Sequence, residues 1–382
     1  EPSAASRRFH QDFALSGRKL GRGAFASVYA ASPLSARGRH EVAVKVVDLS
    51  RSGKASKSWR VVEFEEVALR ALPRSKNIVG FEGSYREDGL SYIVLEACPM
   101  TLWQAFERTP AINELFMKLV FKDMLSGLQA CHGACVVHRD VKGDNFLAVP
   151  DSSPLGFRVK LCDFGFASFV GSPDASDLSG VCGTAQLMAP EIVANEAYGA
   201  KVDIWALGSL AYVLLFGSWP YMPADPTPAR IKAAIATGRP APRFRSSLAD
   251  VSRSATSWVA ALLERNPRYR PSAQMAMNHR AFVLPWGNGG SADQDTLRPS
   301  MQKARRRGAF DNARRSAEPD ALDARVAALV HRYAPAPPDA TSGDASEAQC
   351  TADSRASDTS TVPGSDLGAC AEVEFDDRQQ GE

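Results

Sequence analysis

The most constraining feature of the sequence is the stretch from His138 to Asn145, which reads His-Arg-Asp-Val-Lys-Gly-Asp-Asn. It places close together an aspartate that can accept a hydroxyl proton (Asp140), a lysine that can neutralise phosphate charge (Lys142) and an asparagine that can ligate a metal ion (Asn145). A plain charged loop is the alternative, and a chance match to the whole pattern is improbable. The stretch therefore predicts a catalytic loop.

A glycine-rich turn lies between two predicted strands near the start of the chain. Gly21 and Gly23 there allow backbone N–H groups to approach phosphate oxygens without a Cβ clash. Taken alone, glycines at a hairpin more often mark only a turn. The turn gains meaning from Lys45, which follows on the next predicted strand at a spacing that suits a phosphate contact.

Lys45 ends an apolar strand, where a lysine is normally solvated unless a carboxylate holds it. We predict Glu65 as that carboxylate, because Leu69, four residues on, would point inward from the same helix. Glu63 and Glu66 are less favoured alternatives, and surface charge is the plain interpretation of both.

Asp163 begins an Asp-Phe-Gly triplet eighteen residues after Asn145, directly after a strand-like run over 158–162. An aspartate at a strand end beside a glycine can chelate a hard cation through its carboxylate oxygens. Alone, the triplet would be an ordinary turn. Together with Asn145, it predicts a Mg²⁺ site.

The apolar pattern changes along the chain from strand-like to helical. The first third reads as strands around one helical pattern over 62–72, whereas 114–131 and 202–216 read as long core helices. A small β-rich part followed by a larger α-rich part is therefore expected.

Beyond residue 285, Ala, Ser, Asp, Pro and Gly dominate the composition. The segment 339–382 holds eleven acidic and two basic residues, which predicts disorder because so little apolar area cannot offset the chain entropy. One stretch, 320–333, carries apolar residues at helical spacing. It is either a short docking helix or, as the simpler interpretation, a nascent helix in a disordered tail.

Bulk composition narrows the partners and the compartment. The chain is 45% hydrophobic with a net charge of +2, so we expect a sizeable core and neither a nucleic-acid nor a membrane partner. Its seven scattered cysteines form no Cys-X-X-Cys pair, which favours a reducing compartment, the cytoplasm or the nucleus. The chain begins at Glu1 rather than Met, so a preceding targeting segment stays open.

Together, these motifs resemble the signature set of the eukaryotic protein kinases, serine/threonine type, in order and in interval. The resemblance covers about 13–284 and implies an α+β, two-lobed protein kinase fold, with a small β-rich N-lobe (13–97) and a larger α-helical C-lobe (98–284). A short extension (1–12) precedes this domain, and a low-complexity, mostly disordered tail (285–382) follows it.

The resemblance also implies roles for the matching residues in ATP-dependent phosphorylation of protein substrates. Asp140 would accept the hydroxyl proton beside Lys142 and Asn145, and Asn145 and Asp163 would hold Mg²⁺. Asp203 would brace the catalytic loop. The residues implied to contact the nucleotide, or to hold one that does, are Leu20, Gly21, Gly23, Val28, Ala43, Lys45, Glu65, Leu95, Glu96, Cys98 and Leu147.

Lys142, and Gly183-Thr184 ahead of Ala189-Pro190-Glu191, resemble serine/threonine kinases rather than tyrosine kinases. Phe166, directly after the Asp-Phe-Gly triplet, resembles members that prefer serine. Further similarities point to two different kinase groups, so the group stays open.

Two positions depart from the family pattern. Ala26 replaces the third glycine of the phosphate loop, which predicts weaker nucleotide binding. Gly180 stands where many relatives carry an activating phosphoacceptor, although Arg139, the family's receiver for that phosphate, is present. We therefore hypothesise Ser179 as an alternative phosphosite; activity without phosphorylation is the other interpretation.

The tail segment Arg305 to Phe310 resembles a pseudosubstrate, with arginines followed by a non-phosphorylatable Ala309 and an apolar residue. Autoinhibition by this segment is one interpretation; a basic stretch in a flexible tail, or a nuclear localisation signal, is the plainer one. A catalytically silent scaffold is the competing function, disfavoured because Lys45, Asp140 and Asp163 are all present. The oligomeric state stays open.

Overall fold

The structure is a computed structural model that describes residues 8–23, 26–35, 40–50, 57–245, 247–286, 294–310 and 321–333. The described residues fall within one compact unit, 1–334. The acidic segment 339–382, for which we predict disorder, and Ala24 and Phe25 of the phosphate loop lie outside the described residues.

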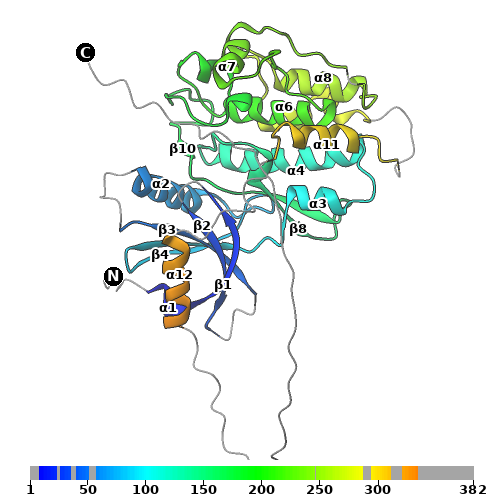
Figure 1. The fold of residues 1–382 in the computed structure, drawn as a ribbon. Helices are drawn as coiled ribbons and strands as arrows, with labels where there is room; N and C mark the ends of the chain where they lie inside the picture. The colour runs from blue at the N-terminus through cyan, green and yellow to red at the C-terminus, as the bar shows by residue number, and fades with distance from the viewer. Residues whose placement is uncertain are drawn as a thin grey trace, which may run out of the picture. The chain divides into compact units, whose positions relative to one another are not determined.

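The small lobe is built on a five-stranded antiparallel sheet in the order β1-β2-β3-β5-β4 (Figure 1). Side chains alternate along β3, so that Val42, Val44 and Val46 enter an outer core while Ala43 faces the inner core toward the large lobe. The strands are β1 Phe13–Arg22, β2 Ser27–Pro33, β3 Val42–Asp48, β4 Phe81–Glu87 and β5 Leu90–Glu96.

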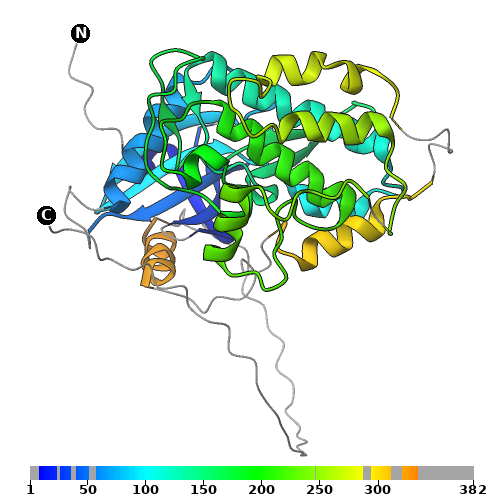
Figure 2. The same cartoon turned by 90° about the horizontal axis from the view of Figure 1, so that it is seen from above.

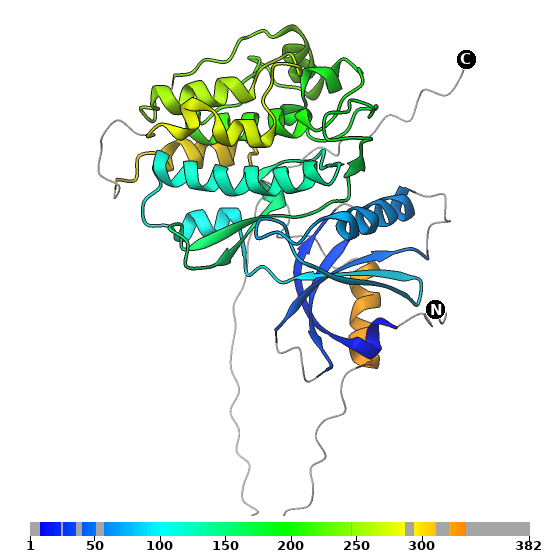
Figure 3. The ribbon, with the colours of Figure 1, turned by 180° about the vertical axis from the view of Figure 1, so that it is seen from behind.

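Helices cover both faces of this sheet. Figure 3 shows the sheet passing between α2 (Lys57–Ala71) and α12 (Ala321–Arg332). The short α1 (Phe9–Asp12) lies on the same outer face as α12, with the ring of Phe9 stacked 4.3 Å from that of Tyr92. The predicted extension 1–12 therefore contributes a core residue to the lobe.

The large lobe is helical around α4 (Glu114–Gly133) and α6 (Lys201–Phe216). Every residue from Val202 to Phe216 is buried, as expected of a helix that is apolar all round. None of the described helices is long and apolar enough to cross a bilayer. The remaining helices of this lobe are α3 Leu102–Arg108, α5 Pro190–Val193, α7 Pro228–Thr237, α8 Arg253–Leu262, α9 Ala273–Asn278, α10 Arg280–Val283 and α11 Arg298–Arg306.

Short strands and turns at the lobe junction position the functional loops. Strands β6, β8 and β9 form a three-stranded sheet, and β7 pairs with β10. These elements place the catalytic loop between β7 and β8, and the Asp-Phe-Gly triplet between β9 and β10. Their bounds are β6 Met100–Thr101, β7 Val136–Val137, η1 Gly143–Asn145, β8 Phe146–Pro150, β9 Phe157–Leu161, β10 Ser168–Phe169 and η2 Ala185–Leu187.

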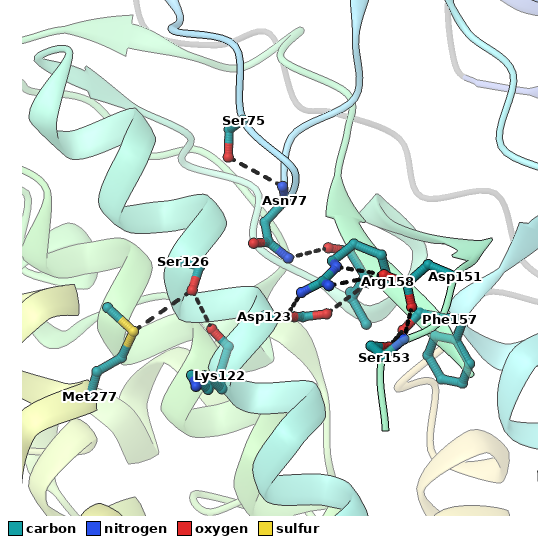
Figure 4. Close-up of polar contacts among 11 residues, drawn as sticks. Ser75, Asn77, Lys122, Asp123, Ser126, Asp151, Ser153, Phe157, Arg158 and Met277 are labelled. Atoms are coloured by element: carbon teal, nitrogen blue, oxygen red, sulfur yellow. Dashed lines mark hydrogen bonds and ion pairs between the residues drawn. The ribbon is translucent and has the colours of Figure 1, made fainter. Parts of the chain in front are cut away.

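The connection from α2 to β4 is anchored to the large lobe by polar contacts (Figure 4). The amide of Asn77 donates to the carbonyl of Val159 at 2.9 Å, and Asp123 on α4 accepts from the Val159 N–H at 3.0 Å. A Cβ at Gly127 on α4 would lie 2.7 Å from the carbonyl oxygen of Asn77. Gly127 therefore permits the close approach of the two lobes here.

The two-lobed α+β architecture is confirmed, whereas the tail up to Tyr333 holds two ordered helices rather than disorder. Figure 2 shows α11 beside the large-lobe helices and α12 beside the small-lobe strands. Met301 of α11 and Val326 of α12 are each 1% exposed. The docking interpretation of 320–333 is thus favoured over the nascent helix, because the apolar stripe of α12 packs on an apolar face of the sheet. The average composition of the tail does not reveal this face.

Candidate active site

Lys45 lies at the centre of the candidate site, on β3. Its Nζ lies 2.7 Å from both carboxylate oxygens of Glu65 on α2, and 2.9 Å from Oδ1 of Asp163. The structure therefore pairs Lys45 with Glu65 rather than with the alternatives. Glu63 is exposed, and Glu66 accepts hydrogen bonds from Arg70 and Ser84 instead.

Burial and charge act in opposite directions on this cluster. Burial alone would lower the pKa of Lys45, but Asp163 and Glu65 outweigh it and raise that pKa. Lys45 in turn holds the pKa of Asp163 well below its usual range. Burial raises the pKa of Glu65, and Lys45 opposes this. Lys45 and Asp163 are therefore ionised at neutral pH.

The predicted catalytic residues meet at Asp140. Lys142 Nζ lies 2.7 Å from Oδ2 of Asp140. The Asn145 side-chain amide donates to the same oxygen at 3.0 Å and to the Asp140 backbone carbonyl at 2.8 Å. Asp140 is 4% exposed, so these contacts fix a largely buried carboxylate in one orientation.

Asn145 carries a polar atom that suits a cation. Its side chain is fully buried, and its Oδ1 has no hydrogen-bond partner among the described residues. A buried carbonyl oxygen without a partner is costly unless a ligand satisfies it. The residues therefore fit a hard cation held by Asn145 and Asp163. Among the described residues, no group of three His, Cys, Asp or Glu side chains could hold a metal ion by itself.

Asp203, at the start of α6, braces the catalytic loop from below. It accepts from the backbone N–H groups of His138 and Arg139, both at 2.8 Å, and its Oδ2 lies 2.9 Å from His132 Nε2. Burial opposes ionisation, but the contact with His132 holds the pKa of Asp203 below its usual value. Arg139 has a positive φ of 64°, a strained backbone conformation that these hydrogen bonds help to maintain.

Apolar packing connects the two lobes behind the site. His138 and Phe164 are fully buried, with ring centroids 5.0 Å apart in an edge-to-face arrangement. Leu69 belongs to the same buried cluster, and Phe81 packs against that cluster. In the large lobe, Glu191 and Arg270 form a buried ion pair, with Nη1 2.6 Å from Oε1.

Most of the residues predicted to contact the nucleotide lie on Lys45's own strand or on strands near it. Val28 lies opposite both Gly21 and Lys45 in the strand pairing, and Ala43 lies opposite Leu95. The N–H of Gly23 donates to the carbonyl of Ala26 at 2.7 Å and closes the base of the phosphate loop. Leu20 is 39% exposed on β1, and Leu147 is half-buried on β8.

The connection between the lobes begins at Glu96. Its carboxylate accepts from the Gly80 N–H at 2.9 Å and pairs with Lys160 at 2.9 Å, so the side chain fixes the end of β5. Burial, aided by Glu96, raises the pKa of the half-buried Cys98 to about 12. Cys98 is therefore a protonated thiol at neutral pH and a poor nucleophile.

Arg139 meets the activation segment, the stretch between the Asp-Phe-Gly and Ala-Pro-Glu motifs. Its Nε donates to the carbonyl of Phe166 at 2.6 Å, and its Nη1 lies 3.4 Å from the hydroxyl of Tyr198. That hydroxyl donates to the carbonyl of Ser179 at 3.3 Å. The hypothesised phosphosite thus shares one network with Arg139.

Comparison with known sequences settles the family, because the profile described as "Protein kinase domain" matches residues 15–282. This chain belongs to the protein kinase family. The kinase is 34% identical over 291 residues to CDPK-related kinase 7 of Arabidopsis thaliana, covering 74% of this chain and 47% of the relative. It is 32% identical over 267 residues to serine/threonine-protein kinase PAK 1 of Mus musculus, covering 70% and 46%. The chain thus spans about half the length of these curated relatives.

Two contacts of this kinase were not predicted residue by residue. A Cβ on Gly143 in the catalytic loop would lie 2.5 Å from the ring of Phe310 and 2.7 Å from the carbonyl of Ala309. Asp323 of α12 bonds Lys19 beside the phosphate loop. Both contacts join the tail to the site across large sequence separations. The pseudosubstrate-like pattern of 305–310 indicated the first, and the helical spacing over 320–333 indicated the second.

Proposed function

We propose that the kinase transfers the γ-phosphate of ATP to serine or threonine hydroxyls of proteins, with serine preferred. The observation that carries the proposal is the joint hold of Glu65 and Asp163 on Lys45, within 2.9 Å. This arrangement connects α2, β3 and the Asp-Phe-Gly segment in one cluster. The similarity to serine/threonine-protein kinase PAK 1 of Mus musculus adds support for a serine/threonine acceptor.

Asp140 orients the attacking hydroxyl and accepts its proton at Oδ1 or Oδ2. Lys142, 2.7 Å from Oδ2, holds that carboxylate in place and lies close enough to oppose charge on the transferring phosphoryl oxygens. Lys45 binds the phosphates nearer the nucleoside, and Glu65 keeps its ammonium group in place. The chain contributes positioning and electrostatic stabilisation rather than covalent chemistry.

Asn145 and Asp163 would hold Mg²⁺, and the ion when bound would neutralise phosphate charge. Asp163 suits this role because Lys45 keeps its carboxylate ionised. Asn145 suits it because its buried Oδ1 needs a partner. The serine preference rests on Phe166, which lies beside the segment that would receive the acceptor peptide and is 44% exposed.

The test is phosphate transfer from labelled ATP with Mg²⁺ to peptide libraries that fix Ser, Thr or Tyr as acceptor. We expect transfer to Ser above Thr, none to Tyr, and loss of transfer in Asp163→Ala. Asp225→Ala is the matched control, because its side chain is 70% exposed and pairs only at the surface with Arg230. Nucleotide binding without any transfer would favour the scaffold function instead. Mass spectrometry of 172–184 in the active protein tests Ser179, and absence of phosphate there contradicts that hypothesis.

The tail segment Arg305–Phe310 is proposed to restrain the active site. Support comes from its packing, since Ala309 and Phe310 are 3% and 4% exposed and contact Gly143, the neighbour of Lys142. Phe310 also packs on Trp103 and Phe106 of α3, and Arg305 pairs with Glu107 at 2.8 Å. This packing is incompatible with the interpretation of a flexible basic stretch.

Substitution in the full chain tests the restraint without removing α12. We expect Phe310→Ala to raise kcat/KM for peptide severalfold, and Gln302→Ala, at an exposed position of α11 before the segment, to leave it unchanged. Equal or lower activity in Phe310→Ala, with an unchanged melting temperature, would contradict autoinhibition. The compartment, cytoplasm or nucleus, stays a proposal that fluorescence microscopy of the tagged chain tests.

A further inference from the structure

The tail helix α12 docks on the outer face of the small-lobe sheet through an apolar stripe. Val326 and Leu329 are 1% and 7% exposed, and they join one buried cluster with Leu15, Tyr29 and Tyr92 of the sheet. Burial of apolar side chains of this size stabilises the docked helix, because it removes apolar area from water. The docked position is therefore a stable part of the lobe.

A carboxylate on the same helix reaches the strands of the phosphate loop. Asp323 lies 2.7 and 2.9 Å from Lys19 Nζ on β1, and it accepts from the Tyr29 hydroxyl on β2. Lys19 and Tyr29 lie directly opposite each other in the strand pairing. One side chain of α12 thus bonds both members of a cross-strand pair.

The pair sits where the ladder between β1 and β2 is irregular. The register shifts on both sides of it, between Leu15 and Lys19 and again between Lys19 and Gly21. Irregular pairing specifies the relative position of two strands less strongly than a continuous ladder. Asp323 therefore joins β1 and β2 at the point where their backbone pairing is least regular.

This point is the stem of the phosphate loop. Lys19 precedes Gly21 by two residues, and Tyr29 follows Val28, the residue opposite Lys45. A displacement of β1 relative to β2 here would move the loop and the wall of the nucleotide pocket together. The contact is thus placed to affect nucleotide binding.

A second anchor sets the orientation of α12. Arg325 lies 2.6 Å from the carboxylate of Asp48 at the end of β3, and it donates to Ser50 Oγ at 2.8 Å and to the Asp88 carbonyl at 2.7 Å. Burial acts against ionisation of Asp48, but the bonds from Arg325 and Ser50 lower its pKa. With both anchors made, Asp323 is held over Lys19.

We propose that Asp323 is a positioning residue for nucleotide, through which the docked tail helix fixes the stem of the phosphate loop. The proposal rests on the nucleotide binding proposed above. It also has the opposite sign to the restraint by Phe310: one part of the tail supports the site that another part restrains. Neutralising Asp323 should weaken nucleotide affinity while leaving kcat at saturating ATP unchanged.

The test uses the full chain and titrates a non-hydrolysable ATP analogue with Mg²⁺ by calorimetry. We expect Asp323→Asn to raise Kd about three- to tenfold, as expected for a partly exposed charge contact, and Asp323→Glu to stay within about twofold of wild type. Steady-state kinetics should show the same rise in KM for ATP, with kcat and the peptide KM unchanged.

A matched pair tests the docking itself. Val326→Asp places a charge in the buried stripe and should weaken analogue binding at least as much as Asp323→Asn. Ala327→Asp adds the same charge at the next, exposed position and should bind as wild type. If Val326→Asp does not fold, Asp323→Asn alone still decides.

Hydrogen exchange of the amides in 19–22 and 27–29 provides a readout that needs no nucleotide. Faster exchange there in Asp323→Asn, with α6 unchanged, supports the proposal. Unchanged exchange together with an unchanged Kd overturns it, as does a lower melting temperature with an unchanged Kd. If wild type bound no nucleotide, the proposed function would fail, and the exchange at the stem would still decide whether Asp323 holds it.

Discussion

Each face of the small-lobe sheet carries an ion pair between a helix carboxylate and a strand lysine, and the two pairs differ in how deeply they are buried. On the inner face, a helix carboxylate (Glu65) holds a strand lysine (Lys45), with side chains 1% and 14% exposed. On the outer side, another helix carboxylate (Asp323) holds another strand lysine (Lys19), with side chains 16% and 30% exposed. Because water screens the outer pair more strongly, the inner ion pair is expected to be the stronger of the two and the less sensitive to solvent conditions.

The two ion pairs contribute to the active site in different ways. The inner pair presents its lysine to the phosphates directly, so its loss removes a charge that acts on the reacting group. The outer pair contacts only the strands behind the loop, so its loss changes where that loop lies. Chemistry should therefore depend on the inner pair, and nucleotide affinity on both.

The largest effect is expected from Lys45→Met. Removing the buried cation leaves Glu65 and Asp163 without their partner and removes a phosphate contact, so kcat/KM should fall at least about 10²- to 10³-fold. Lys19→Met is the matched control on the outer side and should alter only the ATP KM, by about three- to tenfold. Equal losses in the two variants would contradict the division of roles.

The next effect concerns the partner of Lys45. Glu65→Gln keeps the size of the side chain but removes its charge, so Lys45 should be held less firmly and kcat/KM should fall about 10- to 10²-fold. Glu63→Gln, two positions away on the exposed side of α2, should stay within about twofold of wild type. A larger loss in Glu63→Gln than in Glu65→Gln would reassign the partner.

Acid should weaken the inner cluster in a defined direction. Lys45 depresses the pKa of Asp163, so the stability from this charge is present above the unfolded pKa of about 4 and is lost as pH falls through the lower folded pKa. The difference in unfolding free energy between wild type and Asp163→Asn should therefore shrink from pH 7 to pH 3. Denaturant titration at both pH values measures it, and a difference that grows in acid would be inconsistent with the cluster.

The smallest effect is one of ionic strength. The exposed contact of Asp323 with Lys19 is screened by salt, so the ratio of analogue Kd values between Asp323→Asn and wild type should approach one as salt rises from about 0.05 to 0.5 M. The corresponding ratio for Glu65→Gln should change less, because its ion pair is buried. Calorimetry at the two salt concentrations tests both ratios, and equal changes would remove the distinction between the faces.

The residues of the inner cluster and the catalytic loop could be predicted from the sequence, whereas the contacts on the outer face could not. The residues of the catalytic loop and the assignment of Glu65 over Glu63 came from short local patterns, since loop chemistry and helix spacing are encoded within a few residues. The structure places Asp140, Lys142 and Asn145 in contact, as that local spacing implies.

Contacts made across long sequence separations were not predictable in this way. The pairing of Asp323 with Lys19 spans 304 residues, and the requirement for glycine at 127 and 143 depends on which backbone or ring approaches from elsewhere. Composition predicted disorder over the tail because it averages the apolar stripe of α12 with the polar residues around it. A helix that is marginal alone becomes ordered when a sheet face is available to it.

The two tail helices are docked on different lobes and are joined by the fourteen residues 307–320. A helix tethered at this length meets its own binding face at an effective concentration on the order of millimolar, so its docking does not depend on how much protein is present. A separate peptide competing for the outer sheet face must exceed that local concentration to displace α12. Whether α12 covers this face is therefore decided within each molecule as its chain folds.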